Sequence, residues 1–263
     1  MYLFALINFV FRMSFSLKIL GSSSSGNCGL LIVDGVCFLV DAGFSGKKIK
    51  EKLQPLGIKL SDICGVFITH EHHDHVQGLK ALAKFQHIKF YANFKTAQAI
   101  ESHYHLNASW KIFETGENFS INLLEVQSFS ILHDAADPVG FIFRTKKDCC
   151  AWATDTGCLT EKIVSKLIQS NILVVEANHD QGMLWNHPTR PYYLKERVAG
   201  DLGHLSNQEV YKLLKQYPKQ WKQIILLHVS KDCNSVQLLK NMFMPLAQKN
   251  QFLLEIIDPV LNG

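Results

Sequence analysis

The heptapeptide Thr-His-Glu-His-His-Asp-His at residues 69–75 constrains this chain more than any other stretch. It follows a short apolar run that we predict to be a buried strand. Because extended backbone points alternate side chains to the same side, His70, His72 and Asp74 are expected to share one face. Imidazoles and a carboxylate suit zinc and similar divalent ions, and His75 is close enough to serve a second ion. The heptapeptide therefore predicts a hydrolytic site that holds two metal ions.

Histidines also gather in purification tags, and a single histidine in a core is often structural. Here the cluster ends a predicted strand and an apolar helical pattern follows it, so we favour metal binding. His73 alternates out of phase with His70 and His72. We expect His73 to face solvent or to contact a ligand from behind rather than to bind metal.

Length and composition fit one large globular domain. The 263 residues can bury a substantial core, and 47% hydrophobic with 19% charged residues is ordinary for a folded protein. The formal net charge of +4 is compatible with a polyanionic partner such as a nucleic acid but does not require one. The sequence does not indicate an oligomeric state.

Cysteine usage indicates a reducing compartment. Seven cysteines form an odd set with no C-x-x-C pair, which argues against a disulfide framework and against a structural zinc knuckle. They are Cys28, Cys37, Cys64, Cys149, Cys150, Cys158 and Cys233. We therefore expect a cytoplasmic protein.

The first residues are not expected to join the domain. Residues 1–11 are apolar, but they are too few to span a bilayer and they lack the basic start and cleavage site of a signal peptide. Because a strand pattern begins at residues 13–15, we interpret residues 1–12 as a disordered extension or an over-called start. Residues 13–263 are then the hydrolase domain, with no membrane association.

Hydrophobic periodicity predicts an α/β domain with two sheets flanked by helices and with polar site residues at strand ends. We predict strands over residues 15–20, 29–33, 36–40, 65–68, 87–91, 118–126, 128–132, 139–144, 149–153, 172–175, 223–227 and 252–257. We predict helices over residues 47–53, 76–85, 96–104, 160–169, 207–217 and 236–248. Ser206 and Glu209 form a capping box that marks where one helix begins.

Five motifs occur in the order found in the metallo-β-lactamase fold superfamily. They are Asp41-Ala42-Gly43, the histidine cluster, His133-Asp134, Thr154-Asp155-Thr156-Gly157 and Leu227-His228. The chain resembles this superfamily from residue 15 onwards, and the resemblance implies an αββα sandwich of two mixed sheets between helices.

The same resemblance implies a role for each matched residue. One ion would be held by His70, His72 and His133, and the other by Asp74, His75 and His228, with Asp155 bridging the two. Asp41 would support a ligating histidine through a hydrogen bond; the alternative is an ordinary turn aspartate. Two ions about 3.5 to 4 Å apart would lower the pKa of a bridging water. We expect zinc, with manganese as the alternative.

Shorter segments identify a branch of the superfamily. Residues 175–178, 203–207 and 227–230 look like the pattern shared by tRNase Z and its relatives, which are mainly phosphodiesterases. More narrowly, residues 21–28, 69–72, 133–141 and 203–207 resemble the bacterial WalJ (YycJ, VicX) family. That family is associated with 5′ to 3′ exonuclease activity on DNA, so the resemblance implies a DNA substrate, with RNA as the alternative.

Two further groups are candidates for catalysis and substrate binding. His204 would pass a proton to the leaving oxygen and Glu176 would orient it, unless His204 is only a residue near a helix cap. The loop at residues 22–27, with Ser25 and Asn27, offers hydroxyl and amide groups for a phosphate, but it resembles no Walker motif and is equally compatible with a plain hairpin.

Residues 185–197 mix aromatic rings with cations, as surfaces that bind single strands do. The aromatic residues are Trp185, Tyr192 and Tyr193, and the cations are Arg190, Lys195 and Arg197. We predict that Arg190 and Arg197 bind substrate. The alternative is ordinary packing of aromatic side chains between helices.

Other functions remain as alternatives. The same fold also serves hydrolases of thioesters, lactones or β-lactams, although the motif around His204 favours phosphodiesters. His72 argues against a flavodiiron protein, which usually has Glu there, and an open two-metal site argues against a purely structural one. Only 49 positions (204 minus 155) separate Asp155 from His204, too few for the extra domain of RNA-processing β-CASP enzymes. Cys233 stands in a segment that is commonly Asn-rich in this family.

Overall fold

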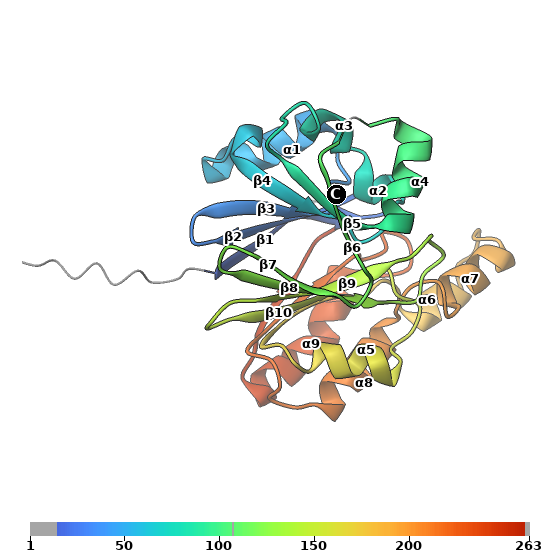
Figure 1. The fold of residues 1–263 in the computed structure, drawn as a ribbon. Helices are drawn as coiled ribbons and strands as arrows, with labels where there is room; N and C mark the ends of the chain where they lie inside the picture. The colour runs from blue at the N-terminus through green and yellow to red at the C-terminus, as the bar shows by residue number, and fades with distance from the viewer. Residues whose placement is uncertain (1–14, 107, 261–263) are drawn as a thin grey trace, which may run out of the picture.

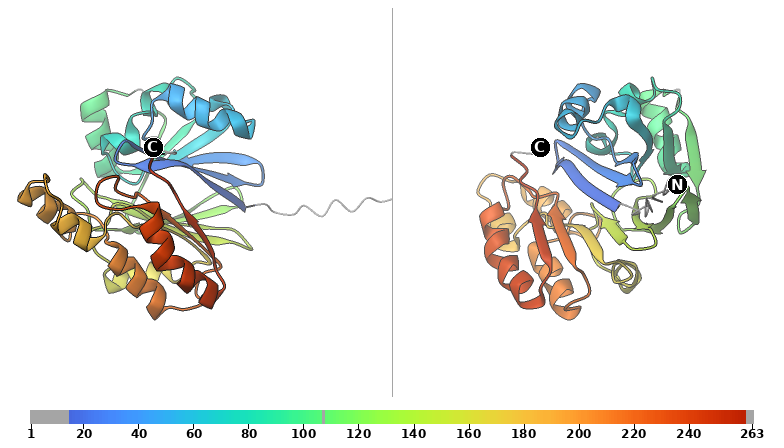
Figure 2. Two further views of the ribbon diagram at one scale, coloured as in Figure 1. Left: turned by 180° about the vertical axis from the view of Figure 1, so that it is seen from behind. Right: turned by 90° about the vertical axis from the view of Figure 1, so that its left-hand side faces the viewer.

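The computed structural model of the protein describes residues 15–106 and 108–260. The predicted extension, residues 1–12, lies outside them. The described strands form two sheets that stack on each other, with helices on both outer faces (Figures 1 and 2). The predicted four-layer α/β architecture is therefore confirmed.

The first sheet contains six described strands in the order β1-β2-β3-β4-β5-β6. Their bounds are β1 Phe15–Ser23, β2 Gly26–Val33, β3 Val36–Val40, β4 Ile63–Phe67, β5 Lys89–Asn93 and β6 Trp110–Phe113. The first three strands pair antiparallel, and the sheet continues in parallel from β3 to β6.

The second sheet contains seven described strands in the order β13-β12-β11-β10-β9-β8-β7. Their bounds are β7 Asn118–Ile121, β8 Leu124–Ser130, β9 Val139–Arg144, β10 Cys149–Ala153, β11 Ile172–Glu176, β12 Gln223–Leu227 and β13 Leu253–Ile256. It is antiparallel from β7 to β10 and parallel from β10 to β13, so both sheets are mixed.

Helices cover the outer faces of the two sheets (Figure 1). Their bounds are α1 Gly46–Leu53, α2 His73–Val76, α3 Leu79–Leu82, α4 Phe94–Tyr104, α5 Glu161–Leu167, α6 Gln181–Trp185, α7 Tyr192–Ala199, α8 Asn207–Gln216 and α9 Val236–Asn250. Helices α1–α4 lie on the first sheet, and α5, α8 and α9 lie on the second. Helices α6 and α7 lie at one end of the sandwich (Figure 1). No helix in the described part of the chain is both long and apolar enough to cross a membrane.

The space between the sheets is filled by large apolar side chains from both. The Phe67 ring of β4 lies 5.7 Å from Phe141 and 5.0 Å from Phe143 of β9, measured between ring centroids. A Cβ atom on Gly29 would clash with the Trp152 ring, so a glycine is needed for this close approach. The tight packing fixes the two sheets relative to each other, and with them every side chain at their shared edge.

Local sequence signals explain several element boundaries. The predicted capping box is confirmed: Ser206 Oγ accepts a hydrogen bond from the Glu209 amide at 3.2 Å, and the Glu209 carboxylate accepts one from the Ser206 amide at 2.9 Å. Thr160 and Ser235 cap α5 and α9 in the same way with their hydroxyls. These caps satisfy amide groups that the first helical turn leaves unpaired.

Several predicted boundaries were wrong. The loop predicted at residues 22–27 is only the tip of a hairpin, as the alternative interpretation held, because β1 runs on to Ser23 and β2 starts at Gly26. The strand predicted over 118–126 is two strands joined at Asn122, whose φ of 53° turns the chain. The single helix predicted over 76–85 is the end of α2 followed by α3, which meet at Gly78. A Cβ there would lie 2.5 Å from Ile49 Cδ1, so the segment approaches α1 too closely for a larger residue.

Candidate metal centre

The candidate site residues follow the ends of strands from both sheets. Asp41 follows β3, the histidine cluster follows β4, Asp155 follows β10 and His228 follows β12. Asp41, Asp155 and His228 have left-handed backbone conformations, with φ of 59°, 56° and 54°. This conformation is unfavourable for a residue with a Cβ, and residues that adopt it are frequent both in turns and at functional sites.

The histidine cluster folds differently from the prediction. Strand β4 ends at Phe67, His72 is the N-cap residue of α2, and Asp74 and His75 lie within that short helix. The prediction that extended backbone brings Asp74 to the same face as His70 was wrong. A loop followed by one helical turn brings the side chains together instead. His73 points away, and its Nδ1 lies 3.0 Å from the Tyr104 hydroxyl.

Three imidazoles form what we call the first ligand set: His70, His72 and His133. One nitrogen from each lies within 4.8 Å of the other two. The other ring nitrogen contacts an uncharged oxygen: Thr69 Oγ1 at 3.0 Å for His70, the Asp134 carbonyl at 3.2 Å for His72, and the Gly203 carbonyl at 3.1 Å for His133. Such contacts orient a ring so that its free nitrogen faces a metal ion.

We call Asp74, His75 and His228 the second ligand set. Asp74 Oδ2 lies 3.7 Å from His75 Nε2 and 3.8 Å from His228 Nε2. Asp41 Oδ2 lies 2.8 Å from His75 Nδ1, which is the contact expected of a carboxylate that supports a ligating histidine. The second set is therefore supported by a carboxylate at the Nδ1 of a ligating histidine, whereas the carboxylate beside the first set, Asp134, lies 3.4 Å from His133 Nε2 and is paired with Arg197.

Asp155 lies between the two sets. Its carboxylate oxygens are 3.3 Å from His75 Nε2 and 3.3 Å from His228 Nε2, and it also groups with His70 and His75 within 4.8 Å. One carboxylate can therefore reach both sets, as a bridging ligand does.

Buried atoms of this site lack hydrogen bonds. In residues 15–106 and 108–260, His70 Nε2, Asp155 Oδ2 and His228 Nε2 are buried and have no hydrogen-bond partner. Buried polar atoms are almost always paired, so three unpaired atoms at one point need another partner. Nitrogen and carboxylate donors in this number suit divalent ions of the zinc type. The residues fit a metal centre.

The charges of the two sets differ. Burial, reinforced by His75, lowers the pKa of His70 well below its usual value, and burial lowers the pKa of His133. Burial also acts on His228, but Asp155, Asp74 and Glu176 outweigh it and raise the His228 pKa to about 9. The pKa of His75 is raised well above its usual value in the same way, against burial, by nearby carboxylates. Without a cation, protons balance these carboxylates.

His204 and Glu176 form a pair beside the ligand sets. Glu176 Oε2 lies 3.0 Å from His204 Nδ1, and Glu176 Oε1 accepts hydrogen bonds from the amides of Thr156 at 2.7 Å and Leu205 at 3.3 Å. The His204 ring stacks on His228 with centroids 5.0 Å apart. This places His204 beside the second ligand set, where it could act as a proton donor or, in a group with Asp155, Glu176 and His228, as a ligand.

Asn27 faces the second ligand set rather than solvent. Its Nδ2 donates to Asp74 Oδ2 at 3.1 Å and lies 3.0 Å from His75 Nε2. Ser22 joins the same network, because its hydroxyl donates to Asn27 Oδ1 at 2.7 Å and accepts from the His228 amide at 2.9 Å. Ser25 is exposed at the hairpin tip. The hairpin therefore braces ligands, and its predicted contact with phosphate stays a prediction.

The aromatic and basic stretch forms α6, α7 and the loop between them. Lys195 Nζ donates to the Trp185 and His187 carbonyls, each at 2.8 Å, so this cation holds α6 to α7. Tyr192 and Tyr193 remain 66% and 67% exposed. The stretch thus combines helix packing with exposed rings, and Lys195 belongs to the packing.

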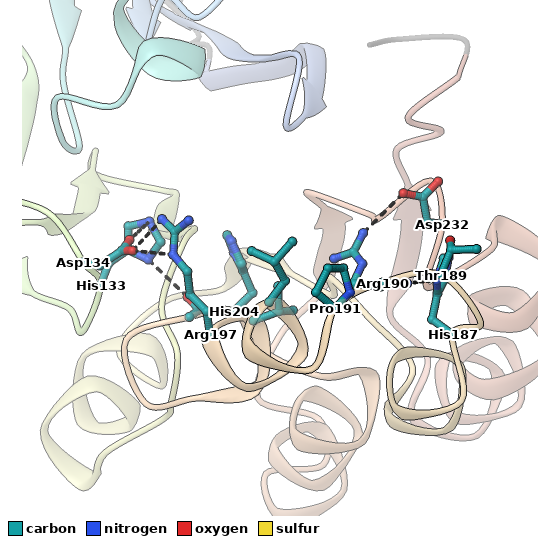
Figure 3. A pocket seen from close by; sticks show the side chains of 12 residues that line it. His133, Asp134, His187, Thr189, Arg190, Pro191, Arg197, His204 and Asp232 are labelled. Carbon is teal, nitrogen blue, oxygen red and sulfur yellow. Dashed lines mark hydrogen bonds and ion pairs between the residues drawn. The ribbon is translucent and has the colours of Figure 1, made fainter.

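A pocket of about 460 Å³ adjoins the metal centre. Figure 3 shows Arg197 beside Asp134 at one end, Arg190 beside Asp232 at the other, and His204 between them. Arg197 donates from Nε at 2.9 Å and from Nη2 at 2.6 Å to Asp134 Oδ2. Both arginines predicted to bind substrate therefore line one pocket beside the candidate metal ligand His133.

Sequence reasoning missed supporting residues. Asn178 Nδ2 donates to the His228 carbonyl at 2.9 Å and lies 3.1 Å from its Nδ1. Asn234 in turn donates to the Asn178 carbonyl at 3.1 Å. An asparagine contact is therefore made from the residue next to Cys233, within the segment that is commonly Asn-rich in this family. The position of Asn178, directly after Glu176 and Ala177, is a signal that could have identified it.

Known proteins are similar in sequence to this chain over most of its length. Residues 37–229 match the family described as beta-lactamase superfamily domain. The chain is 35% identical over 238 residues to exodeoxyribonuclease WalJ of Streptococcus pneumoniae, which covers 89% of this chain and 88% of that protein. It is 33% identical over 234 residues to exodeoxyribonuclease YycJ of Bacillus anthracis, with 87% of each covered.

The fold comparison points the same way. The metallo-beta-lactamase fold protein YhfI from Bacillus subtilis superimposes with a TM-score of 0.73 at 12% identity, covering 94% of this chain and 97% of that one. At this identity the match shows the fold alone. By sequence and by fold, the chain belongs to the beta-lactamase superfamily and, within it, to the family of WalJ and YycJ.

Proposed function

We propose that this chain is an exodeoxyribonuclease that holds two divalent metal ions and digests DNA in the 5′ to 3′ direction. The observation that carries the proposal is the convergence of buried, unpaired donor atoms of His70, Asp155 and His228 at one point. The relationship to WalJ and YycJ over most of both chains supports DNA as the substrate. RNA is the alternative substrate, and a cytoplasmic location stays a prediction.

The two ligand sets would hold one ion each. The first set is His70, His72 and His133, the second is Asp74, His75 and His228, and Asp155 would bridge them. Zinc suits these donors, with manganese as the alternative. When bound, two such ions lower the pKa of a shared water and offset charge that develops at the attacked phosphate.

His204 would supply the proton that the leaving oxygen needs. Its Nδ1 is held at 3.0 Å by Glu176, whose other oxygen is fixed by the Thr156 and Leu205 amides. A buried carboxylate in contact with Nδ1 fixes the orientation of the imidazole and leaves the opposite ring nitrogen as the one that donates the proton. Glu176 is therefore a positioning residue and His204 the proton donor.

A substrate panel tests the proposal. Metal-replete protein is incubated with 5′-phosphorylated single- and double-stranded DNA, with RNA and pre-tRNA, and with a lactone, a thioester and a β-lactam. We expect stepwise release of mononucleotides from DNA and no comparable turnover of the small acyl substrates. Asp74→Ala, which lacks a ligand of the second set, is the inactive control. Faster hydrolysis of a thioester, lactone or β-lactam than of any nucleic acid would replace the proposal with the small-molecule alternative.

His204→Ala separates proton transfer from metal binding. We expect turnover of DNA to fall by about 10² to 10⁴ while metal content and DNA affinity stay nearly intact, because only a transition-state interaction is lost. Metal analysis and single-turnover kinetics give the two readouts. If the variant purifies with fewer ions than the wild type, His204 is a ligand, as its grouping with Asp155, Glu176 and His228 permits.

A further inference from the structure

The pocket beside the metal centre contains two arginine–aspartate pairs of unequal strength. Arg197 gives two hydrogen bonds, at 2.9 and 2.6 Å, to Asp134, a partly buried residue next to the candidate ligand His133. Arg190 gives one hydrogen bond, at 3.2 Å, to Asp232, whose side chain is 64% exposed. Exposed single-contact pairs contribute little, so an anion can displace Asp232 from Arg190 far more easily than Asp134 from Arg197.

The Arg197–Asp134 pair belongs to the support of the first ligand set. The Asp134 carbonyl contacts His72 Nε2 at 3.2 Å, and Asp134 Oδ1 lies 3.4 Å from His133 Nε2. Arg197 fixes this aspartate from outside, and its hydrogen bond is the chief influence that lowers the Asp134 pKa against burial. Arg197 therefore positions ligands and is poorly placed to exchange partners.

The opposite end of the pocket has the chemistry of a phosphate site. The Arg190 side chain is only 22% exposed, and within the described residues one N–H of its guanidinium is used in a hydrogen bond. The hydroxyl of Thr189 lines the same end, and the Arg190 amide is tied to His187 Nδ1 at 3.1 Å, which fixes the loop (Figure 3). A guanidinium with free donors beside a hydroxyl binds phosphate oxygens well.

We propose that this pocket holds the terminal nucleotide of the DNA strand, with its 5′-phosphate on Arg190 and Thr189. This assignment rests on the nuclease function proposed above and explains why digestion would run from the 5′ end to the 3′ end. The pocket has a volume of about 460 Å³, which is typical of a site for a small molecule. Pro191, Leu194 and Val198 form an apolar wall of the pocket that can contact the sugar and base.

The position of His204 sets the direction of the strand. His204 lines the pocket between its two ends, so the group that receives its proton belongs to the nucleotide in the pocket (Figure 3). In the reaction, a water oxygen bonds to the phosphorus that links the first two nucleotides, the bond from phosphorus to the 3′-oxygen of the first nucleotide breaks, and that oxygen takes the proton. The first nucleotide leaves with its 5′-phosphate, and the remaining strand carries a new 5′-phosphate. Each cut thus creates the end that the pocket binds next.

The test compares DNA that carries a 5′-phosphate with the same DNA that carries a 5′-hydroxyl. We expect the wild type to prefer the phosphorylated end in kcat/KM, and Arg190→Ala to reduce that preference by about tenfold to a hundredfold, the effect of losing charge-assisted hydrogen bonds. Arg197→Ala should lower the rates on both ends alike and leave the preference in place. Asp232→Asn should keep or increase the preference, because it frees Arg190.

Arg144→Ala is the matched control, because it removes an arginine at the end of β9 that lies away from the metal centre. The other end of β9 lies beside the centre, where the Val139 amide donates a hydrogen bond to the Thr69 carbonyl. An equal rate on both ends in the wild type, or the same loss of preference in Arg197→Ala as in Arg190→Ala, would overturn the pocket assignment. Binding of thymidine 5′-monophosphate, compared with the 3′-monophosphate, needs no turnover. If the protein binds the 5′-monophosphate through Arg190 but digests no DNA, the pocket assignment stands and the nuclease function is rejected. If it digests DNA without any end preference, the nuclease function stands and the pocket assignment is rejected.

Discussion

The two ligand sets lie side by side and use similar side chains, but their surroundings differ. In the first set His70 and His133 contact uncharged oxygens, the nearby Asp134 carboxylate is paired with Arg197, and the pKa values of His70 and His133 are lowered, so these two rings are already neutral. In the second set Asp41 contacts His75, and carboxylates raise the pKa of His228 to about 9. A metal ion can therefore bind the neutral imidazoles of the first set directly, whereas it must displace protons from the imidazoles of the second set.

The two metal ions are therefore expected to bind in a fixed order. Neutral imidazoles accept a cation at once, whereas protonated rings beside carboxylates are stabilised without one. We therefore expect the first set to fill first and the second set to decide whether the centre is complete at a given pH. Four measurements test whether the two sets differ in this way.

The largest effect should come from Asp155→Ala, which removes the one carboxylate that reaches both sets. We expect both ions to bind more weakly and DNA turnover to fall by roughly 10³-fold or more, because the charge that supports the reaction is lost. Metal analysis of the purified variant and initial rates check this. Two ions retained with wild-type affinity would show that Asp155 bridges nothing.

Removing one histidine from either set should separate them. His228→Ala is expected to lower the metal content from about two ions to about one, and His133→Ala to do the same through the other set. The remaining ion identifies the set: its affinity should be nearly independent of pH in His228→Ala and strongly dependent on pH in His133→Ala. Identical pH profiles for the two variants would contradict an unequal pair of sets.

Asp41→Asn tests the charged support of the second set. Asp41 contacts His75 Nδ1 at 2.8 Å and accepts hydrogen bonds from the Thr69 amide and hydroxyl, each at 2.9 Å. Losing such a support typically weakens metal binding by about 10- to 100-fold. Titration with a competing chelator should show this loss for one ion and a smaller change for the other. Equal weakening of both would mean that Thr69, which also contacts His70, transmits the effect.

The smallest expected effect is the change in metal affinity of the second set with each unit of pH. At pH 7 a metal-free His228 with a pKa of about 9, above its ordinary value of 6.5, carries a proton that must leave when metal binds. Because the pKa of His75 is raised as well, the affinity of the second set should rise by at least tenfold per pH unit up to about pH 9. Calorimetry in buffers of different ionisation enthalpy measures the released protons. Binding of the second ion without proton release at pH 7 would refute the charge difference.

Much of the metal centre could be predicted because its residues lie in short motifs at the ends of apolar runs. The limits of β9, β10 and β12 match the prediction, since each is an apolar run bounded by polar or turn residues. The supports were harder to predict. The Gly203 and Asp134 carbonyls orient His133 and His72, but every residue has a carbonyl, so no side-chain pattern marks them.

Elements with little buried surface were also missed. Strand β6 has two exposed residues in its centre, and α7 has no buried residue, so neither has a clear apolar period. The shape of the histidine cluster was predicted wrongly because a motif fixes which residues occur but not the backbone between them. The pocket likewise joins residues from loops that are far apart in the sequence, and only the folded chain shows that Arg190 and Arg197 have unequal partners.

The left-handed backbone at Asp41, Asp155 and His228 has a consequence for how this protein trades stability against activity. A glycine adopts that conformation freely, whereas each of these residues loses roughly 1 kcal/mol or more by adopting it. If only backbone strain is considered, glycine at each of the three strand ends would increase the free energy of unfolding. Glycine substitutions after β3, β10 and β12 would therefore raise thermal resistance only by losing the metal centre, so stabilising substitutions should be sought at left-handed residues outside the site, such as Asn122 and Gln251.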